Sequence, residues 1–257
     1  MSQPDRFEQL LAEGAAVPVE GWDFSWFEGR ATEERPSWGY TATLVGRIGA
    51  AAAVLDIQTG GGEVFAEVLT RAGARPPTMA VTESWGPNLE IATRTLAPFG
   101  LAVVGAPDDA PLPFPADRFD LIVSRHPTVT VWDEIARTLK PGGTYLSQQI
   151  GAGSNRELID FMMGPQPVSD RHHVDRARAQ AERAGLEVVD LRHESLRAVF
   201  SDIGAVVHFL RKVVWTVPGF SVDAYRPRLR QLHEDIETHG PFVSHAQRFL
   251  IEAHRPV

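Results

Sequence analysis

The sequence predicts an α/β protein built on a doubly wound, mainly parallel sheet, and two features support this. Between residues 53 and 150, short apolar runs alternate with segments whose apolar residues recur at helical spacing. Such alternation is typical of βαβ units, in which helices cover both faces of a parallel sheet. Three consecutive glycines at 60–62 also separate an apolar run from a helical pattern, at the place where such sheets bind ligands.

Seven strands are expected in chain order, five in the alternating region and two after it. They are predicted over 53–57, 78–83, 101–106, 119–124, 144–150, 186–194 and 245–255. The apolar spacing predicts helices over 63–73, 87–100, 131–143 and 171–185. The third of these is expected to end at a Pro-Gly-Gly sequence.

The whole chain, 1–257, is predicted to form a single domain with additions at both ends of the core. Residues 1–47 are expected to form an N-terminal helical cap, in which a first helix ends at Gly14. Residues 48–195 form the core, 196–240 a helical insertion and 241–257 the last strand. The cap contains Trp22, Trp26 and Trp38, which we expect to pack in a core.

Composition excludes several classes of function. The formal net charge is −8, from 25 basic and 33 acidic residues, and this argues against a nucleic-acid binder. The chain has no cysteine, which excludes disulfides, thiolate metal sites and a cysteine nucleophile. No apolar run approaches a membrane-spanning length, and the polar N-terminal stretch does not resemble a signal peptide. We therefore expect a soluble cytoplasmic protein without a membrane partner or a bound metal.

The glycine loop, in the stretch DIQTGGG from Asp56 to Gly62, differs from the common phosphate-binding loops. Phe65 stands where a dinucleotide-binding loop has its third glycine, and no Gly-Lys-Ser/Thr follows. Asp56 would repel a pyrophosphate but attract an ammonium group. Glu83, at the end of the next strand, can accept both hydroxyls of a ribose. A ribose joined to an amino acid is the structure of S-adenosylmethionine.

At this point the sequence resembles the class I S-adenosylmethionine-dependent methyltransferases. The resemblance rests on four motifs that stand in the family's order across residues 53–151. They are VLDIQTGGGE, VTESWGPNLEIA, DDAPLPFPADRFDLIVSRHP and EIARTLKPGGTYLSQQIG. It implies a Rossmann-like seven-stranded sheet and S-adenosylmethionine as the cofactor.

The resemblance also implies a cofactor site. Asp56 and the loop glycines would hold the methionine end, and Glu83 the ribose. Asp109 would reach the adenine amino group, the backbone of Ala110 the ring, and Trp85 the ring face. The full set of implied cofactor-binding residues is Asp56, Gln58, Gly60, Gly62, Glu83, Ser84, Trp85, Asp109, Ala110 and Ser124.

Gln58 departs from the family pattern, in which a glycine occupies this position. A non-glycine residue there must avoid a strained backbone. Its amide is expected near the methionine carboxylate.

The candidate catalytic residues end the strand 119–124. His126 is the candidate general base because its unperturbed pKa lies near neutrality. Arg125 could anchor an acidic group of the substrate, and Gln148 and Gln149 are expected at the same edge. The alternatives remain that His126 only shapes its loop and that Arg125 only forms a surface ion pair. His208, in the insertion, could face either the core or a substrate.

The resulting hypothesis is a methyltransferase that transfers a methyl group to O or N of a small organic molecule of specialised metabolism. The apolar insertion 196–240 could cover a pocket for that molecule. Two alternatives remain open. The fold could bind the cofactor and act as a cyclase or a regulator, or it could methylate RNA or protein. The oligomeric state is open.

Overall fold

The computed structural model describes residues 5–19, 21 and 24–257, so Trp22 lies outside the described residues. Contacts divide the chain into two compact units. The first, here called the helical unit, comprises Met1–Arg35, Gly153–Ser169 and Ser195–Gln247. The second, the core unit, comprises Pro36–Ala152, Asp170–Glu194 and Arg248–Val257. The single domain over the whole chain stays a prediction.

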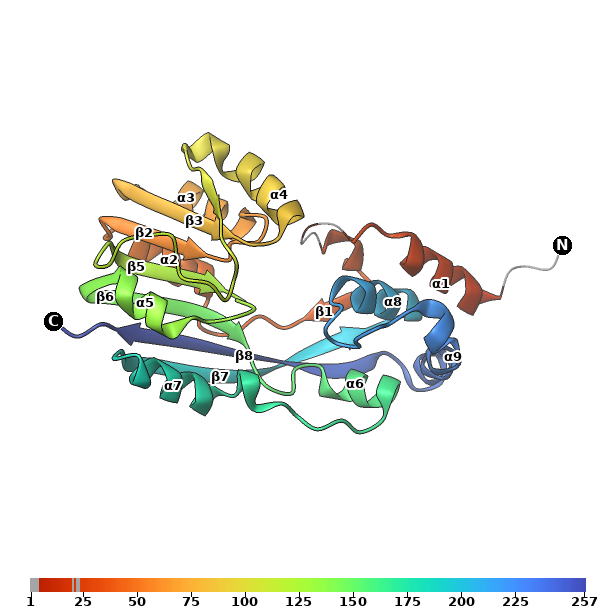
Figure 1. Cartoon of the computed structure of the whole chain (residues 1–257). Coiled ribbons are helices and arrows are strands. Elements are labelled where there is room, and N and C mark those ends of the chain that lie inside the picture. Colours follow the sequence, from red (N-terminus) through yellow and green to blue (C-terminus); the bar gives the residue numbers. More distant parts are fainter. Residues whose placement is uncertain (1–4, 20, 22–23) are drawn as a thin grey trace. The chain divides into compact units, whose positions relative to one another are not determined.

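The strands form one sheet in the order β1-β7-β8-β6-β5-β2-β3-β4 (Figure 1). The strands β2 to β6 pair in parallel, and β8 pairs antiparallel with β6. Their bounds are β1 Ala31–Glu33, β2 Ala53–Ile57, β3 Thr78–Glu83, β4 Val103–Gly105, β5 Phe119–Arg125, β6 Leu139–Ile150, β7 Glu187–Phe200 and β8 Phe242–His254. The doubly wound α/β fold is therefore confirmed.

The sheet has eight strands where the sequence predicts seven. The additional strand, β1, has three residues and pairs antiparallel with Ala198–Phe200 of β7, within the helical unit. It lies in a stretch interrupted by glycine, proline and charges, where so short an edge strand leaves no alternating pattern to read.

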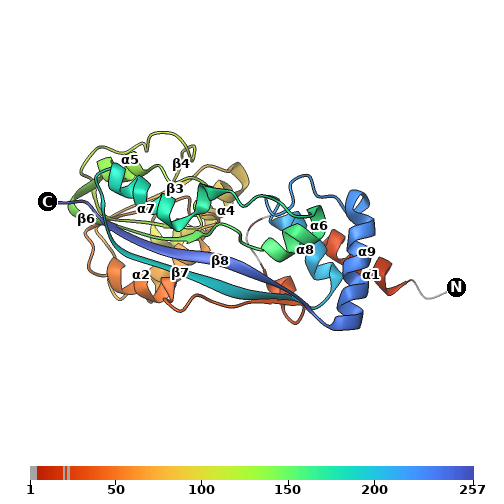
Figure 2. The ribbon, with the colours of Figure 1, turned by 90° about the horizontal axis from the view of Figure 1, so that it is seen from below.

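Helices cover both faces of the sheet in the core unit. The helices α2 (Tyr40–Ile48), α3 (Glu63–Arg71) and α4 (Gly86–Leu96) pack on one face. The helices α5 (Trp132–Thr138) and α7 (Val174–Arg183) pack on the other, and Figure 2 shows α2 and α7 on opposite sides of the sheet. Short 3₁₀ turns occupy Ala97–Phe99 and Asp170–His172. This arrangement leaves the carboxyl ends of β2, β3 and β5 at a common edge.

The helix predicted over 131–143 is too long. α5 ends at Thr138, and Leu139 begins β6 with its side chain fully buried. Pro141 explains the difference, because the residue before a proline disfavours helical geometry. Gly142 then turns the chain with φ 76° and donates its N–H to the Arg255 carbonyl.

The helical unit has its own apolar core, formed by α1 (Arg6–Ala16), α6 (Arg156–Met163), α8 (Ile203–Lys212), α9 (Val222–His239) and the 3₁₀ turn Ser25–Phe27. α6 was not predicted. Gly14 does not end the first helix, which continues to Ala16. A glycine is required at position 14 because α8 approaches α1 closely at this point. A Cβ on Gly14 would lie 2.3 Å from the Gly204 carbonyl oxygen.

Candidate functional site

Glu83 links the glycine loop to the end of β3. Its carboxylate accepts the Gly60 N–H at 2.8 Å through Oε2 and the Trp85 N–H at 2.9 Å through Oε1. Burial is the main cause that raises the pKa of this carboxyl above its ordinary value. Because parallel strands end at the same edge, two acids far apart in sequence, Asp56 and Glu83, meet beside the same loop.

The glycines at 60 and 62 are required by geometry. Their φ angles are 66° and 80°, in the left-handed region that side chains rarely adopt. A Cβ on Gly62 would also lie 3.0 Å from Cγ of Leu96 in α4. The loop therefore turns directly into α3, whose first N–H groups are available to a ligand.

Asp56 is buried at the end of β2. Burial above all, together with the neighbouring Glu83 carboxylate, raises the pKa of its carboxyl to about 7. Two buried carboxyls that oppose each other's ionisation are stabilised by a bound cation. This is the property expected of a site for a ligand's ammonium group.

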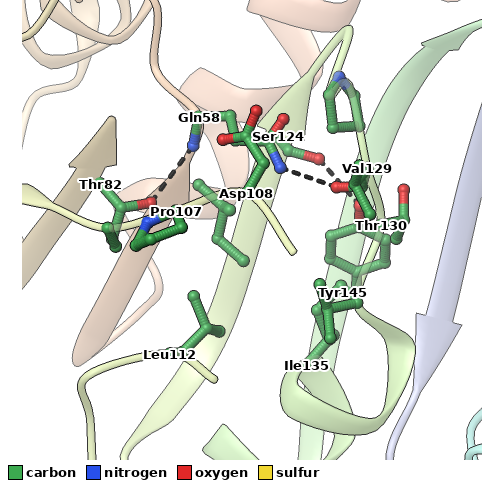
Figure 3. A pocket seen from close by; sticks show the side chains of 14 residues that line it. Gln58, Thr82, Pro107, Asp108, Leu112, Ser124, Val129, Thr130, Ile135 and Tyr145 are labelled. Carbon is green, nitrogen blue, oxygen red and sulfur yellow. Dashed lines mark hydrogen bonds between the residues drawn. The ribbon is translucent and has the colours of Figure 1, made fainter. Parts of the chain in front are cut away.

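Gln58 has φ 56°, so it adopts the strained conformation that a glycine would adopt freely. Its amide Nε2 donates to the Val129 carbonyl at 2.7 Å (Figure 3). Its Oε1 accepts the Thr128 N–H at 2.6 Å. The amide thus joins the glycine loop to the segment after β5. Its expected position at a methionine carboxylate stays a prediction.

A small pocket opens beside Gln58, with a free volume of about 20 Å³, room for roughly one water molecule. Asp108 lines this pocket, whereas the predicted Asp109 is exposed and does not. One oxygen of Asp108 accepts a hydrogen bond from the Thr128 hydroxyl, and the other, Oδ1, is buried without a partner among the described residues. An orphaned carboxylate oxygen fits a ligand that presents an N–H.

Sequence reasoning missed Asp108 because it and Asp109 are adjacent identical residues in an irregular loop. Only the direction of the chain after Ala106, whose N–H donates to the Glu83 carbonyl, turns one of them inward. The role of Asp109 in adenine recognition stays a prediction.

The remaining predicted cofactor residues are distributed around this edge. Trp85 precedes α4 and is 50% exposed, while Ser84 is exposed and Ala110 half-buried. Ser124 lines the pocket but is fully buried, and its hydroxyl is hydrogen-bonded to those of Tyr145 and Ser147, each at 2.8 Å. This edge of the sheet therefore carries the half-exposed ring of Trp85 and the hydrogen-bonded hydroxyls around Ser124.

The predicted catalytic pair ends β5. Arg125 is exposed, and His126 adopts a left-handed φ of 56°. The His126 N–H donates to the Gln148 carbonyl at 2.7 Å, so the residue is held by β6. Burial, followed by the positive charges of Arg125 and Arg248, lowers the pKa of His126 well below its ordinary value. The imidazole is neutral at physiological pH.

His208 lies in the helical unit, not in the core unit that holds the glycine loop. It is buried, stacks on Phe27 with ring centroids 4.9 Å apart, and meets the edge of Trp26. Burial lowers its pKa to about 4, so its environment is that of a neutral core residue.

Two further findings concern the described residues as a set. Among residues 5–19, 21 and 24–257, no group of three or more His, Asp or Glu side chains is placed to hold a metal ion. In the same part of the chain, every helix is too short or too polar to cross a membrane.

A known protein family matches the part of the chain that carries the glycine loop. The family described as "Methyltransferase domain" matches residues 55–147, which include the glycine loop, Glu83 and His126. No curated protein sequence matches the chain.

Solved structures share the fold at low identity. A protein from Bacillus halodurans C-125 assigned as a methyltransferase is 16% identical, with TM-score 0.59, over 84% of this chain and 99% of its own. The (4+2) cyclase SpnF is 18% identical, with TM-score 0.52, over 97% and 93%. A Haemonchus contortus phosphoethanolamine N-methyltransferase, in complex with phosphomonomethylethanolamine and S-adenosylhomocysteine, is 16% identical, with TM-score 0.51, over 86% and 53%. Residues 55–147 thus match a methyltransferase domain family, and the chain has the fold of class I S-adenosylmethionine-dependent methyltransferases.

Proposed function

We propose that this protein binds S-adenosylmethionine and transfers its methyl group to O or N of a small organic molecule. The observation that carries this proposal is the joint position of Glu83, Asp56 and the glycine loop at one edge of the sheet. Asp56 would bind the ammonium group, Glu83 the ribose hydroxyls and Asp108 the adenine amino group. Trp85 would cover the adenine face.

When bound, S-adenosylmethionine supplies a methyl group already activated on a sulfonium. The protein's own residues then have three tasks: they hold the cofactor, they orient the acceptor in line with the methyl group and they exclude water. Alignment of this kind is the main contribution required of the enzyme. A general base is needed only where the attacking O or N atom of the methyl acceptor carries a proton that must be removed.

A small acceptor is supported by charge. A net charge of −8 does not favour an RNA substrate. The phosphoethanolamine N-methyltransferase among the similar structures is named for a small acceptor. We accordingly propose a cytoplasmic enzyme of specialised metabolism whose partner is a small molecule.

A second candidate function is a cyclase that retains the cofactor pocket. It is supported by the similarity to SpnF, which extends over 97% of this chain.

The test uses methyl-labelled S-adenosylmethionine with two fractions of an extract from the source organism, one of small molecules and one of macromolecules. Calorimetry with S-adenosylhomocysteine runs alongside. Label in a small molecule supports the proposal, and label in RNA or protein overturns its acceptor class. Binding without label in either fraction favours the cyclase, and failure to bind S-adenosylhomocysteine overturns the cofactor.

A further inference from the structure

A line of three side chains connects the segment before α2 to the end of β5. The indole Nε1 of Trp38 lies 2.8 Å from Oε1 of Gln148. On the other side of the same amide, Nε2 of Gln148 lies 3.0 Å from Nε2 of His126. Trp38 and Gln148 are both buried, at 8% and 4% exposure, so water does not compete for the bond between them.

The hydrogen-bond donors and acceptors of these three side chains can be assigned in only one consistent way. An indole N–H is a donor and never an acceptor, so the Gln148 atom that faces it must be the amide oxygen. The amide NH₂ of Gln148 therefore faces His126 and donates to its Nε2. A neutral imidazole has one donor and one acceptor nitrogen, so the proton of His126 is on Nδ1.

The backbone and the electrostatics favour the same state. His126 has a left-handed φ of 56°, which is strained for a non-glycine residue, and its N–H is bonded to the Gln148 carbonyl. Strain that surrounding bonds maintain is a feature of functional sites. In a protonated ring, two donors, the Nε2–H of His126 and the NH₂ of Gln148, would face each other, which is unfavourable. The positive charges of Arg125 and Arg248 also disfavour protonation of the ring.

We propose that Trp38 and Gln148 hold His126 in the Nδ1–H tautomer, and that this N–H donates a hydrogen bond to an oxyanion of a bound ligand. His126 then acts as a donor and not as the general base that the sequence suggests. Its Nε2 is already bonded to Gln148, and its Nδ1 carries a proton. Within the described residues, Gln148 is the side-chain partner of this ring, and the residue is half-buried.

An oxyanion is the favoured partner because Arg125 and Arg248 impose a positive potential on the ring. The oxyanion could belong to the methionine carboxylate of the cofactor or to an acidic group of the acceptor. This second half of the inference rests on the proposed function, whereas the tautomer does not.

The tautomer is tested by ¹⁵N NMR of histidine-labelled protein. His126→Asn, which tolerates the left-handed backbone, identifies the His126 signals among those of nine histidines. We expect the wild-type proton on Nδ1. Gln148→Glu has the same shape but offers only acceptors, so it should move the proton to Nε2 and raise the pKa of His126. Trp38→Phe should give a mixture, because Gln148 can then turn over.

A wild-type proton on Nε2, or a tautomer unchanged by Gln148→Glu, would overturn the assignment. A variant that fails to fold is recognised by the loss of dispersed spectra, and the wild-type spectrum alone then decides. This measurement needs no ligand, so its outcome is independent of whether the protein binds S-adenosylmethionine.

The oxyanion is tested with three probes. If it is the cofactor's carboxylate, His126→Asn should weaken S-adenosylhomocysteine about tenfold and leave 5′-methylthioadenosine, which lacks the carboxylate, unchanged. If it belongs to the acceptor, both affinities stay unchanged, and inorganic phosphate should shift the wild-type His126 Nδ1 signal saturably. If neither effect is observed, the proposal of a bound oxyanion is wrong. Should S-adenosylhomocysteine not bind at all, the proposed cofactor fails, and the phosphate titration of the free protein still decides this point.

Discussion

Oε1 of Gln58 accepts the backbone N–H of Thr128 at 2.6 Å, and this bond joins the glycine loop to the segment that follows β5. The same amide donates to the Val129 carbonyl at 2.7 Å. Gln58 therefore accepts a strained backbone where a glycine would be unstrained, and its side chain gains hydrogen bonds to Thr128 and Val129. The balance of these two effects is measurable.

Replacing Gln58 separates strain from bonding. Gln58→Ala loses the side-chain bonds to Thr128 and Val129 but keeps the left-handed backbone, so it should lower the free energy of unfolding by about 1–3 kcal/mol. Gln58→Gly loses the same bonds and relieves the strain, so it should be about 1 kcal/mol more stable than Gln58→Ala. Urea unfolding measures both. Equal stability of the two variants would show that the φ angle of 56° is not maintained in solution.

Glu83 should be the main determinant of cofactor affinity. In Glu83→Gln the amide NH₂ must face one of the two N–H donors, Gly60 or Trp85, and one acceptor for ribose is lost. We expect S-adenosylhomocysteine to bind at least about tenfold more weakly by calorimetry.

The matched control is Glu67→Gln, on the exposed side of α3. The Glu67 side chain is 54% exposed, and its carboxylate pairs with Arg71. Its affinity should match the wild type. A similar loss in both variants would mean that the effect is one of overall charge.

Asp56 should make stability depend on pH. Its pKa is about 7 in the folded protein and 3.8 in the unfolded chain. The unfolded chain therefore releases this proton at lower pH, and stability falls as pH rises from about 4 to 7, by an amount on the order of 4 kcal/mol. Thermal unfolding across this range checks the sign.

Asp56→Asn removes the titrating group and should flatten this part of the profile. In the wild type, binding of an ammonium group requires the ionised carboxylate, so S-adenosylhomocysteine should bind more tightly at pH 8 than at pH 6. An affinity that does not depend on pH would show that Asp56 does not bind the ammonium group.

Trp85 should contribute to binding without contributing to stability. Half of its side chain is exposed, and the stacking of a base on an aromatic ring contributes about 1–3 kcal/mol. Trp85→Ala should weaken S-adenosylhomocysteine about tenfold and leave the melting temperature unchanged. Trp215→Ala removes a tryptophan of similar exposure, 53%, from the helical unit and should not affect affinity.

The close approach of α1 and α8 should tolerate no side chain at Gly14. A Cβ there would lie 2.3 Å from the Gly204 carbonyl oxygen, so Gly14→Ala should lower stability by about 1–3 kcal/mol. Gly46→Ala, inside α2 with open space around it, should instead raise stability by about 0.5–1 kcal/mol. A destabilised Gly46→Ala would contradict the packing argument.

Local pattern was sufficient for the strands that fill the sheet. The strands predicted over 53–57 and 78–83 have the observed bounds, because each contains the short apolar run that is typical of a parallel strand. Pattern failed where a partner decides the structure. Leu139 continues a helical stripe in the sequence, yet it pairs with Phe119 as a strand. The three residues of β1 become a strand only because β7 extends beyond its predicted end to Phe200.

The sequence by itself determined the fold class, the glycine loop and the acids that end β2 and β3, because these depend on periodicity and on residue types at fixed spacing. Only the tertiary structure decided that Asp108 and not Asp109 lines the pocket, that Gln58 is bonded to residues 128 and 129, and that Gln148 lies between Trp38 and His126. The physical reason is that the direction of a side chain in a loop, and the proton on a histidine, depend on partners distant in the chain. Trp38 and Gln148 are separated by 110 residues, and no local pattern relates them.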